Sequence, residues 1–332
     1  MTPSYIPKNN ATSHGIQSNT EKWLWIVYLL IVFISSLLGD VIVLVSSIKY
    51  NAFKLNESII ALIQHIAVCD LTLSLAWVLP IGISVVAEDW IFGKRLAQMQ
   101  EFIMFAYPTS TLLVCLLTTS KFMMVRYPLK TRAWTAKETH VVCGLGWLGF
   151  ALYSLVNLIK HKDILIFDYS TYEIDYHVSS ESTLLPLMRG SAYNIILAII
   201  ILFSILTLRL MLRARNVSRI ASGTVRWQGI LTVVLTATVF SVSSLPYFIY
   251  LIAEPLVSEP LPLLKRISEY LSMLNLMSNF YIYCMTVPSF RKFLRSKVLR
   301  ICPHFVRKVK DQPLETHEEF EMRGVKTEEC EL

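Results

Sequence analysis

Seven apolar stretches constrain this chain more than any other feature of its sequence. A helix that crosses the hydrocarbon core of a bilayer, about 30 Å thick, needs roughly 20 mostly apolar residues. Seven segments meet or approach that length: 24–48, 59–86, 102–125, 139–159, 193–212, 230–253 and 267–287. The sequence therefore predicts an all-α membrane protein, a seven-transmembrane helix bundle that occupies residues 24–287.

The composition supports the same class of protein. Hydrophobic residues make up 54% and charged residues 17% of the 332-residue chain, whereas soluble domains average roughly 45–50% and about 25%. Such a chain has too few charges to cover a surface that faces water. The six cysteines form neither a Cys-x-x-Cys pair nor a Cys/His cluster, so we expect no metal site and no disulfide framework.

The distribution of Lys and Arg predicts which way the bundle faces. Segments 49–58, 121–138, 209–226 and 287–310 carry 20 basic residues, and the segments that alternate with them carry 9. Because basic residues gather on the cytoplasmic side, we expect an extracellular N-terminal tail at 1–23 and a cytoplasmic C-terminus. This topology, together with contact to membrane lipids, explains the net charge of +7 without nucleic acid.

Three further features lie outside the predicted bundle. Asn10 begins an Asn-Ala-Thr triplet, a glycosylation signal on the outer side. Residues 288–302 place apolar and basic side chains at helical spacing, which predicts a short amphipathic eighth helix on the membrane surface. Cys302 at its end is a candidate palmitoylation site, with an unmodified thiol as the alternative. We expect the polar residues 303–332 to form a disordered cytoplasmic tail.

Two carboxylates lie inside the predicted spans. Asp40 and Asp70 each follow an apolar run, and Ser110, Asn275 and Asn279 add neutral polar groups on other spans. Ionisable residues in a span are costly and normally face the interior of the bundle, where they serve a function. A cation or proton site and a structural hydrogen-bond network both fit this pattern.

Several motifs follow one another along the spans in a familiar order. They are Asp70, Trp90-Ile91-Phe92-Gly93, Tyr127-Pro128-Leu129, Trp147, the Phe240 to Leu245-Pro246 segment, Asn279-Phe280-Tyr281-Ile282-Tyr283 and Phe290-Arg291-Lys292-Phe293. In this order, from about residue 24 to 300, the chain resembles the rhodopsin-like (class A) G-protein-coupled receptors.

The resemblance implies a plasma-membrane receptor, and not an enzyme, that transmits the signal of an extracellular ligand to heterotrimeric G proteins. It implies an ion or switch network made of Asp40, Asp70, Ser110, Asn275, Asn279 and Tyr283. It implies a sixth-helix switch at Phe240, Ser244 and Pro246. Two carboxylates in a medium of low dielectric cannot both ionise cheaply, so we expect Asp40 and Asp70 to share a proton or bind a sodium ion; we expect no other cofactor.

The chain departs from the family's pattern at the predicted inner end. The Asp-Arg-Tyr triplet of the family reads Ser120-Lys121-Phe122, and Arg226 stands where the sixth helix usually carries an acid. Two cations cannot form the usual ion pair. We therefore predict raised basal activity or altered coupling at the G-protein-facing residues Lys121, Arg126 and Arg226. The alternative is a Lys121 that only reaches toward lipid phosphate.

Other departures lie in the core and on the outer side. Asp40 replaces the usual first-helix asparagine, Ser244 the sixth-helix tryptophan and Phe280 the seventh-helix proline. The cysteines of the family's outer disulfide are missing, so we expect no disulfide.

The ligand is constrained mainly by what the outer positions lack. Ile103 stands where amine receptors carry an aspartate, and Met273 stands where opsins carry the retinal-binding lysine. An unknown peptide or small molecule is therefore a better fit than a biogenic amine or retinal. The candidate pocket residues are Ile103, Tyr107, Tyr193, Glu269, Tyr270 and Met273. Tyrosines and glutamates at the ends of spans also serve as interface anchors.

Two other interpretations stay open. An ion-coupled transporter would use Asp40 and Asp70 as an ion path, and a non-signalling seven-helix scaffold would tolerate the substitutions at Lys121, Ser244 and Phe280. We find no phosphate-binding glycine loop or nucleophile motif in the sequence that would indicate an enzyme.

Overall fold

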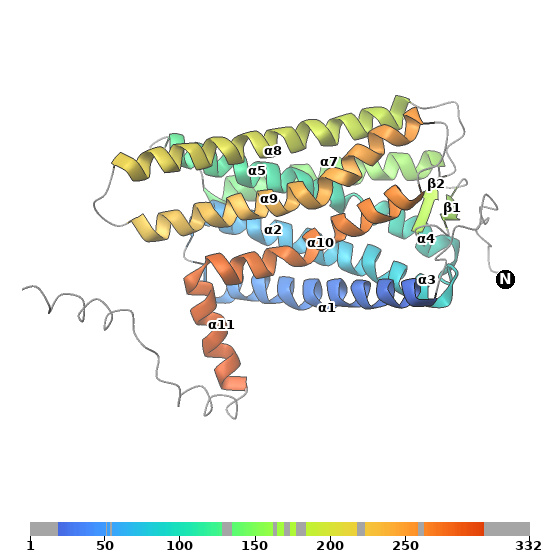
Figure 1. Ribbon diagram of the computed structural model, residues 1–332, viewed down its shortest axis with the longest axis horizontal. Helices are drawn as coiled ribbons and strands as arrows, with labels where there is room; N and C mark the ends of the chain where they lie inside the picture. The colour runs from blue at the N-terminus through green and yellow to red at the C-terminus, as the bar shows by residue number, and fades with distance from the viewer. Residues whose placement is uncertain are drawn as a thin grey trace, which may run out of the picture.

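The computed structural model describes residues 19–50, 52–53, 55–127, 135–161, 165–168, 173–176, 184–217, 223–257 and 262–301. Long helices run side by side along the molecule (Figure 1). The helices are α1 (Asn19–Tyr50), α2 (Glu57–Leu73), η1 (Ser74–Val78), α3 (Leu79–Ala87), α4 (Gly93–Ile103), α5 (Ala106–Arg126), α7 (Ala136–His161), α8 (Leu184–Val217), α9 (Gly223–Ala253), η2 (Glu254–Leu256), α10 (Pro262–Thr286) and α11 (Pro288–Ile301).

Six helical segments among the described residues are long and apolar enough to cross a membrane. They are Asn19–Tyr50, Glu57–Ala87, Gly93–Arg126, Ala136–Lys160, Gly190–Leu210 and Ile230–Ala253. These six segments match the first six predicted spans. The helix of the first begins at Asn19, inside the predicted tail, and that of the fifth begins at Leu184, earlier than predicted.

The seventh predicted span corresponds to α10, a helix of 25 residues that is not among these six. Its polarity explains the difference, because Lys265, Arg266, Glu269, Asn275 and Asn279 all lie on it. All five side chains are nonetheless buried. The helix packs along α9 and α1, so it is an integral part of the bundle.

Prolines explain two interruptions that the sequence analysis did not predict. The second span is broken by the π-helical turn η1, where the Leu79 N–H bonds to the Ser74 carbonyl. Pro80 follows directly and cannot donate to a helical bond, and its ring displaces the carbonyl four residues earlier. The third span is divided into α4 and α5 at Met104 and Phe105. Pro108 lies in the first turn of α5, the position in a helix that proline tolerates best.

A short β-hairpin, which the sequence analysis did not predict, accompanies the helical bundle. Strands β1 (Leu165–Asp168) and β2 (Glu173–Tyr176) pair antiparallel, with Leu165 opposite Tyr176. Phe167 is buried, and its ring centroid lies 6.5 Å from that of Trp90. The hairpin thus covers the end of the bundle that carries α4 (Figure 1).

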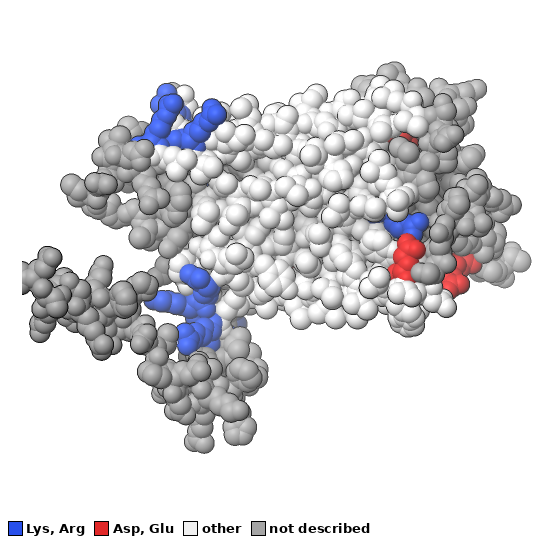
Figure 2. All heavy atoms as spheres, in the orientation of Figure 1, with Lys and Arg blue, Asp and Glu red and all other residues white. Residues whose placement is uncertain are grey.

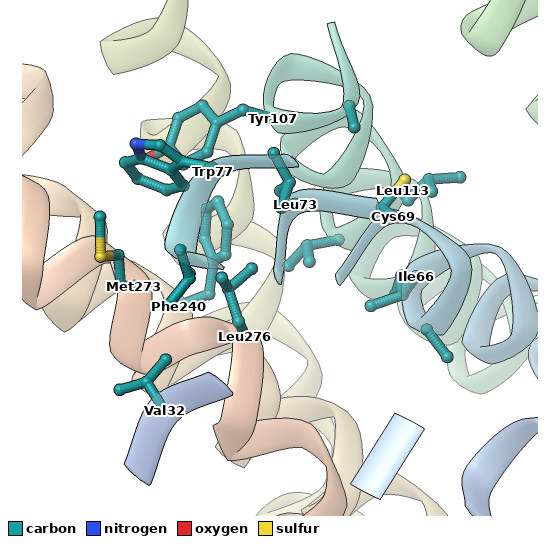
Figure 3. Packing of buried hydrophobic residues seen from close by; sticks show 14 of the residues in the cluster. Val32, Ile66, Cys69, Leu73, Trp77, Tyr107, Leu113, Phe240, Met273 and Leu276 are labelled. Carbon is teal, nitrogen blue, oxygen red and sulfur yellow. The ribbon is translucent and has the colours of Figure 1, made fainter. Parts of the chain in front are cut away.

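The molecule is apolar along its length and charged at its ends. On the face shown in Figure 2, Lys and Arg gather at the end that carries α11, and acidic side chains lie at the opposite end. Side chains from different helices fill the space between them; Val32, Leu73, Trp77, Phe240, Met273 and Leu276 are labelled in Figure 3. Helix α5 is central, since it packs against α2, α7, α8 and α9.

Candidate functional site

A buried hydrogen bond joins the second span to α10 at the centre of the bundle. The Asn279 Nδ2 donates to Asp70 Oδ2 at 2.7 Å. Asp70 is fully buried and Asn279 is 2% exposed. Residues 70 and 279 are far apart in the sequence, so this bond fixes α2 against α10 inside the bundle, where an ionisable group is costly.

The second carboxylate, Asp40, lies in a short chain of hydroxyl groups. Ser36 Oγ donates to Asp40 Oδ2 at 2.8 Å, and Ser74 Oγ donates to Ser36 Oγ at 2.6 Å. All three residues are buried. The two carboxyl groups of Asp40 and Asp70 lie close enough to interact electrostatically. The structure therefore brings both sequence-predicted carboxylates into one polar core, and adds Ser36 and Ser74 to it.

Five buried oxygens of this polar core have no hydrogen-bond partner among the described residues. They are Asp70 Oδ1, Ser110 Oγ, Asn275 Oδ1, Asn279 Oδ1 and the Tyr283 hydroxyl. The great majority of buried polar atoms in proteins have a hydrogen-bond partner. Carboxylate oxygens and uncharged oxygens are also the ligands that hard cations prefer. The donor set thus fits a small hard cation or a proton. Within the described ranges, no group of three or more His, Cys, Asp and Glu side chains could hold a metal ion.

The predicted residues of the sixth-helix switch all lie on α9. Phe240 is buried in α9, and Ser244 is buried with a hydroxyl that has no partner in the described part of the chain. Pro246 lies within α9, which continues through it to Ala253.

An aromatic cluster lies between the polar core and the end that carries the β-hairpin. We define it as Trp77, Tyr107, Tyr193, Tyr247 and Phe248. Tyr193 stacks on Phe248 with centroids 5.0 Å apart, and Tyr107 contacts Trp77 edge-on at 5.9 Å and Tyr247 at 5.6 Å. Only Tyr107 and Tyr193 were predicted, because the other three carry no signal that separates them from ordinary apolar residues of a span.

The other predicted pocket residues lie elsewhere. Tyr270 stacks on Trp25 of α1, with ring centroids 4.1 Å apart, and its carbonyl accepts a hydrogen bond from the Tyr28 hydroxyl. It thus fastens α10 to α1 rather than joining the aromatic cluster. Met273 is fully buried in the core, and Ile103 is half-buried as the last residue of α4.

Charged side chains are buried on the first turns of α10. Lys265, Arg266 and Glu269 are each less than 10% exposed. Arg266 Nη1 donates to Glu21 Oε1 of α1 at 2.8 Å. Glu269 was predicted as a pocket residue, whereas the two cations beside it were not.

At the opposite end, a hydrogen bond between two threonines joins α9 to α10. Thr232 Oγ1 donates to Thr286 Oγ1 at 2.7 Å, and both residues are buried. Sequence analysis did not find this pair, since threonines are common in spans. Lys121 is half-buried on α5, and the Arg126 guanidinium lies 5.3 Å from the Tyr127 ring centroid.

Some predicted residues cannot be placed. Arg226 belongs to α9, but its side chain is not described by the structure. Asn10 and Cys302 lie outside the described residues. Each of these predictions stays a prediction.

The sequence matches the family model described as 7 transmembrane receptor (rhodopsin family) over residues 39–283. The match covers well over half of the chain. The chain belongs to this family. Comparison with curated proteins gave no match. Apart from Ser36, the residues of the polar core lie within the matched segment, whereas α11 and residues 19–38 of α1 lie outside it.

One departure from the rhodopsin family's pattern has a visible structural partner. Phe280 stands where the seventh helix of the family usually carries proline, and it lies against Gly39 of α1. A Cβ on Gly39 would lie 2.7 Å from Phe280 Cβ and 2.9 Å from its Cγ. These distances are shorter than any ordinary carbon contact. The absence of a side chain at residue 39 therefore makes room for the phenylalanine.

Helix α11 is fixed to the connection between α1 and α2. Phe290 is fully buried and stacks on Phe53, with centroids 4.8 Å apart, and Ser289 Oγ donates to the Phe53 carbonyl at 3.1 Å. The Lys297 ammonium lies 4.2 Å from the Tyr50 ring centroid. These contacts set the direction in which α11 leaves the bundle (Figure 1).

Proposed function

We propose that this chain is a plasma-membrane receptor that binds an extracellular ligand and activates heterotrimeric G proteins. The rhodopsin-family match supports the receptor class. The observation that carries the proposal is the buried Asp70–Asn279 hydrogen bond. An ionisable group inside a membrane bundle marks a functional site by default, and this one connects two helices that must move relative to each other for a signal to cross.

In this proposal α10 is the seventh crossing and α11 lies along the inner leaflet. Polar residues are tolerated in a membrane helix where neighbouring helices satisfy them, and the polar residues of α10 are buried. Arg291, Lys292 and Arg295 of α11 are exposed basic residues suited to anionic lipid headgroups. The basic end of the molecule then faces the cytoplasm.

The polar core would serve as the switch. Asp40 and Asp70 would share a proton or bind a sodium ion, with Ser110, Asn275 and Asn279 as further oxygen donors. The five unpartnered oxygens of the core support this role. A ligand that binds one arrangement of the helices more tightly shifts the population toward it. Since the core residues come from different helices, that shift would change their contacts and their affinity for the cation.

The ligand would bind on the outer side of this core, above the aromatic cluster. The aromatic faces and the Tyr107 hydroxyl of this cluster suit a ligand with an apolar group and a hydrogen-bonding group. The buried charges of Lys265, Arg266 and Glu269 support a ligand that is itself charged, such as a peptide. Ile103 and Met273 argue against a biogenic amine or retinal.

At the inner end, Lys121, Arg126 and Arg226 would face the G protein. Arg226 stands at the sixth-helix position where the family usually carries an acid, so the family's usual ion pair cannot form in the closed arrangement, in which the inner ends of the helices lie together. The Thr232–Thr286 hydrogen bond would then be a main polar contact holding α9 against α10. We expect measurable signalling without ligand.

The test is ligand-independent G-protein activation in cells, comparing the wild type with Asp70→Asn and Lys121→Ala at equal surface expression. The proposal expects a wild-type signal above an empty-vector control and a change of that signal in each variant. A wild type indistinguishable from the empty vector across all G-protein classes would oppose it.

The second candidate is a seven-helix scaffold that no longer signals. Three substitutions at switch positions favour it, namely Lys121, Ser244 and Phe280. If the chain is a scaffold, neither the wild type nor the variants activate a G protein, and the chain binds a partner protein stably. An ion-coupled transporter predicts instead a current or substrate uptake that is lost in Asp40→Asn.

A further inference from the structure

Two histidines from different helices meet outside the site described above. His65 lies on α2 and His140 on α7, and the Nε2 of the first is 3.0 Å from the Nδ1 of the second. The ring centroids are 5.2 Å apart, with an angle of 58° between the ring planes. The two helices pack against each other along their length. The ring nitrogens therefore face one another across a helix–helix contact.

This spacing is the one that a tetrahedral metal ion requires. Two imidazole nitrogens bound to one zinc ion at about 2.0–2.1 Å lie about 3.3 Å apart. The centroid of each imidazole ring lies about 1.2 Å from the bound nitrogen, on the side away from the metal. The two ring centroids then lie about 5.2 Å apart. The observed centroids already have this separation. An ion can thus enter when the rings rotate about their centres, without a movement of either helix.

The surroundings leave the pair accessible. His65 is half-buried and His140 is exposed. His140 is the fifth residue of α7, about 6 Å along the axis from the helix start, so it lies near the end of the bundle rather than at its centre. The nearest acid in the sequence, Glu138, already accepts a hydrogen bond from the Thr135 N–H at 2.8 Å. The nitrogens are therefore not enclosed by protein, and water that enters from the near end of α7 would complete a coordination shell.

We propose that His65 and His140 hold one divalent transition-metal ion, zinc or copper, as a clip between α2 and α7. Neutral imidazole nitrogens suit these metals, whereas magnesium and calcium prefer oxygen. Cys69 and Cys143 lie one turn further along the same helices, but within the described ranges no third His, Cys, Asp or Glu joins the pair. The ion would have two protein ligands and bound water, so it would exchange readily and act as a modulator.

Thermal melting of the purified full-length chain in detergent tests the clip. Zinc chloride is added to the purified chain in increasing concentration, and the Tm is measured at each step. A sample treated with EDTA and a sample with magnesium chloride serve as references. We expect zinc at a hundred times its Kd to raise Tm by about 5 °C, and magnesium to have no effect. His65→Phe and His140→Phe keep a ring of similar size, remove the nitrogens and should each abolish the shift. His161→Phe, at the other end of α7, should retain it.

Copper(II) electron paramagnetic resonance gives a readout that a purely structural role would not change. The wild type should show coupling to two imidazole nitrogens, and each single variant should lose one of the two. The melting temperature without metal shows for each variant whether it is folded. The proposal is overturned if the wild type shows no zinc-dependent shift, or if the shift or the two-nitrogen signal persists in the His65→Phe/His140→Phe double variant.

Discussion

Gly39→Ala should destabilise the bundle, because the added methyl group collides with Phe280. The new Cβ would lie 2.7 Å and 2.9 Å from the Cβ and Cγ of Phe280, whereas carbon atoms prefer about 3.5–4.0 Å. The obstructing atoms are next to the backbone, so rotating the ring does not clear them. Helix α10 would have to withdraw from α1 by roughly 1 Å.

The magnitude follows from two opposing effects. Overpacking of this kind costs about 1–3 kcal/mol, and alanine gains up to about 1 kcal/mol over glycine in a helix. We expect a net loss of about 1–2 kcal/mol, which corresponds to a fall in Tm of roughly 2–4 °C. Thermal melting of the purified chain measures it.

Two further variants isolate the contact. Gly144 on α7 has nothing within 4 Å of its would-be Cβ, so Gly144→Ala should leave Tm unchanged or raise it. Phe280→Gly removes both obstructing atoms, Cβ and Cγ, and should remove most of the penalty of Gly39→Ala, giving a favourable coupling in a double-mutant cycle. The reasoning is refuted if Gly39→Ala melts at or above the wild type, or if its penalty is unchanged beside Phe280→Gly.

Three other predictions concern the polar groups. Asn279→Ala removes the donor to Asp70 Oδ2 and should cost about 1–3 kcal/mol of stability; an unchanged Tm would argue that the bond is not formed. Thr232→Val keeps the side-chain shape and removes the hydrogen bond to Thr286, which should raise basal signalling roughly two- to tenfold if that bond contributes about 0.5–1.5 kcal/mol to the closed arrangement. Asp40→Asn should abolish the sodium and pH dependence of signalling, and an unaltered dependence would count against a shared proton or cation.

The membrane spans could be predicted because hydropathy and length are local properties. The same is true of Asp70 and Asn279, which stand out as polar residues within apolar runs. Their direct bond confirms that both face the interior. Helix α10 shows the limit of hydropathy, since its polar residues are buried only where α9 and α1 pack against it in the folded bundle.

Contacts between distant residues could not be predicted in this way. Ser36 and Ser74 lie on different spans, and nothing in the sequence indicates that their hydroxyl groups meet. The aromatic cluster depends on how far each helix is rotated, and the π-helical turn before Pro80 changes that rotation for Trp77. In a regular α-helix the Trp77 side chain would point in a different direction.

The central claim is that the polar core works inside a signalling receptor. The most direct measurement is the rate of GDP release from purified heterotrimeric G proteins by the purified chain in lipid nanodiscs, beside Asp70→Asn discs and empty discs. The account predicts that the wild type exceeds empty discs for at least one G-protein class and that Asp70→Asn changes this rate. Equal rates for wild type, variant and empty discs in every class would contradict it.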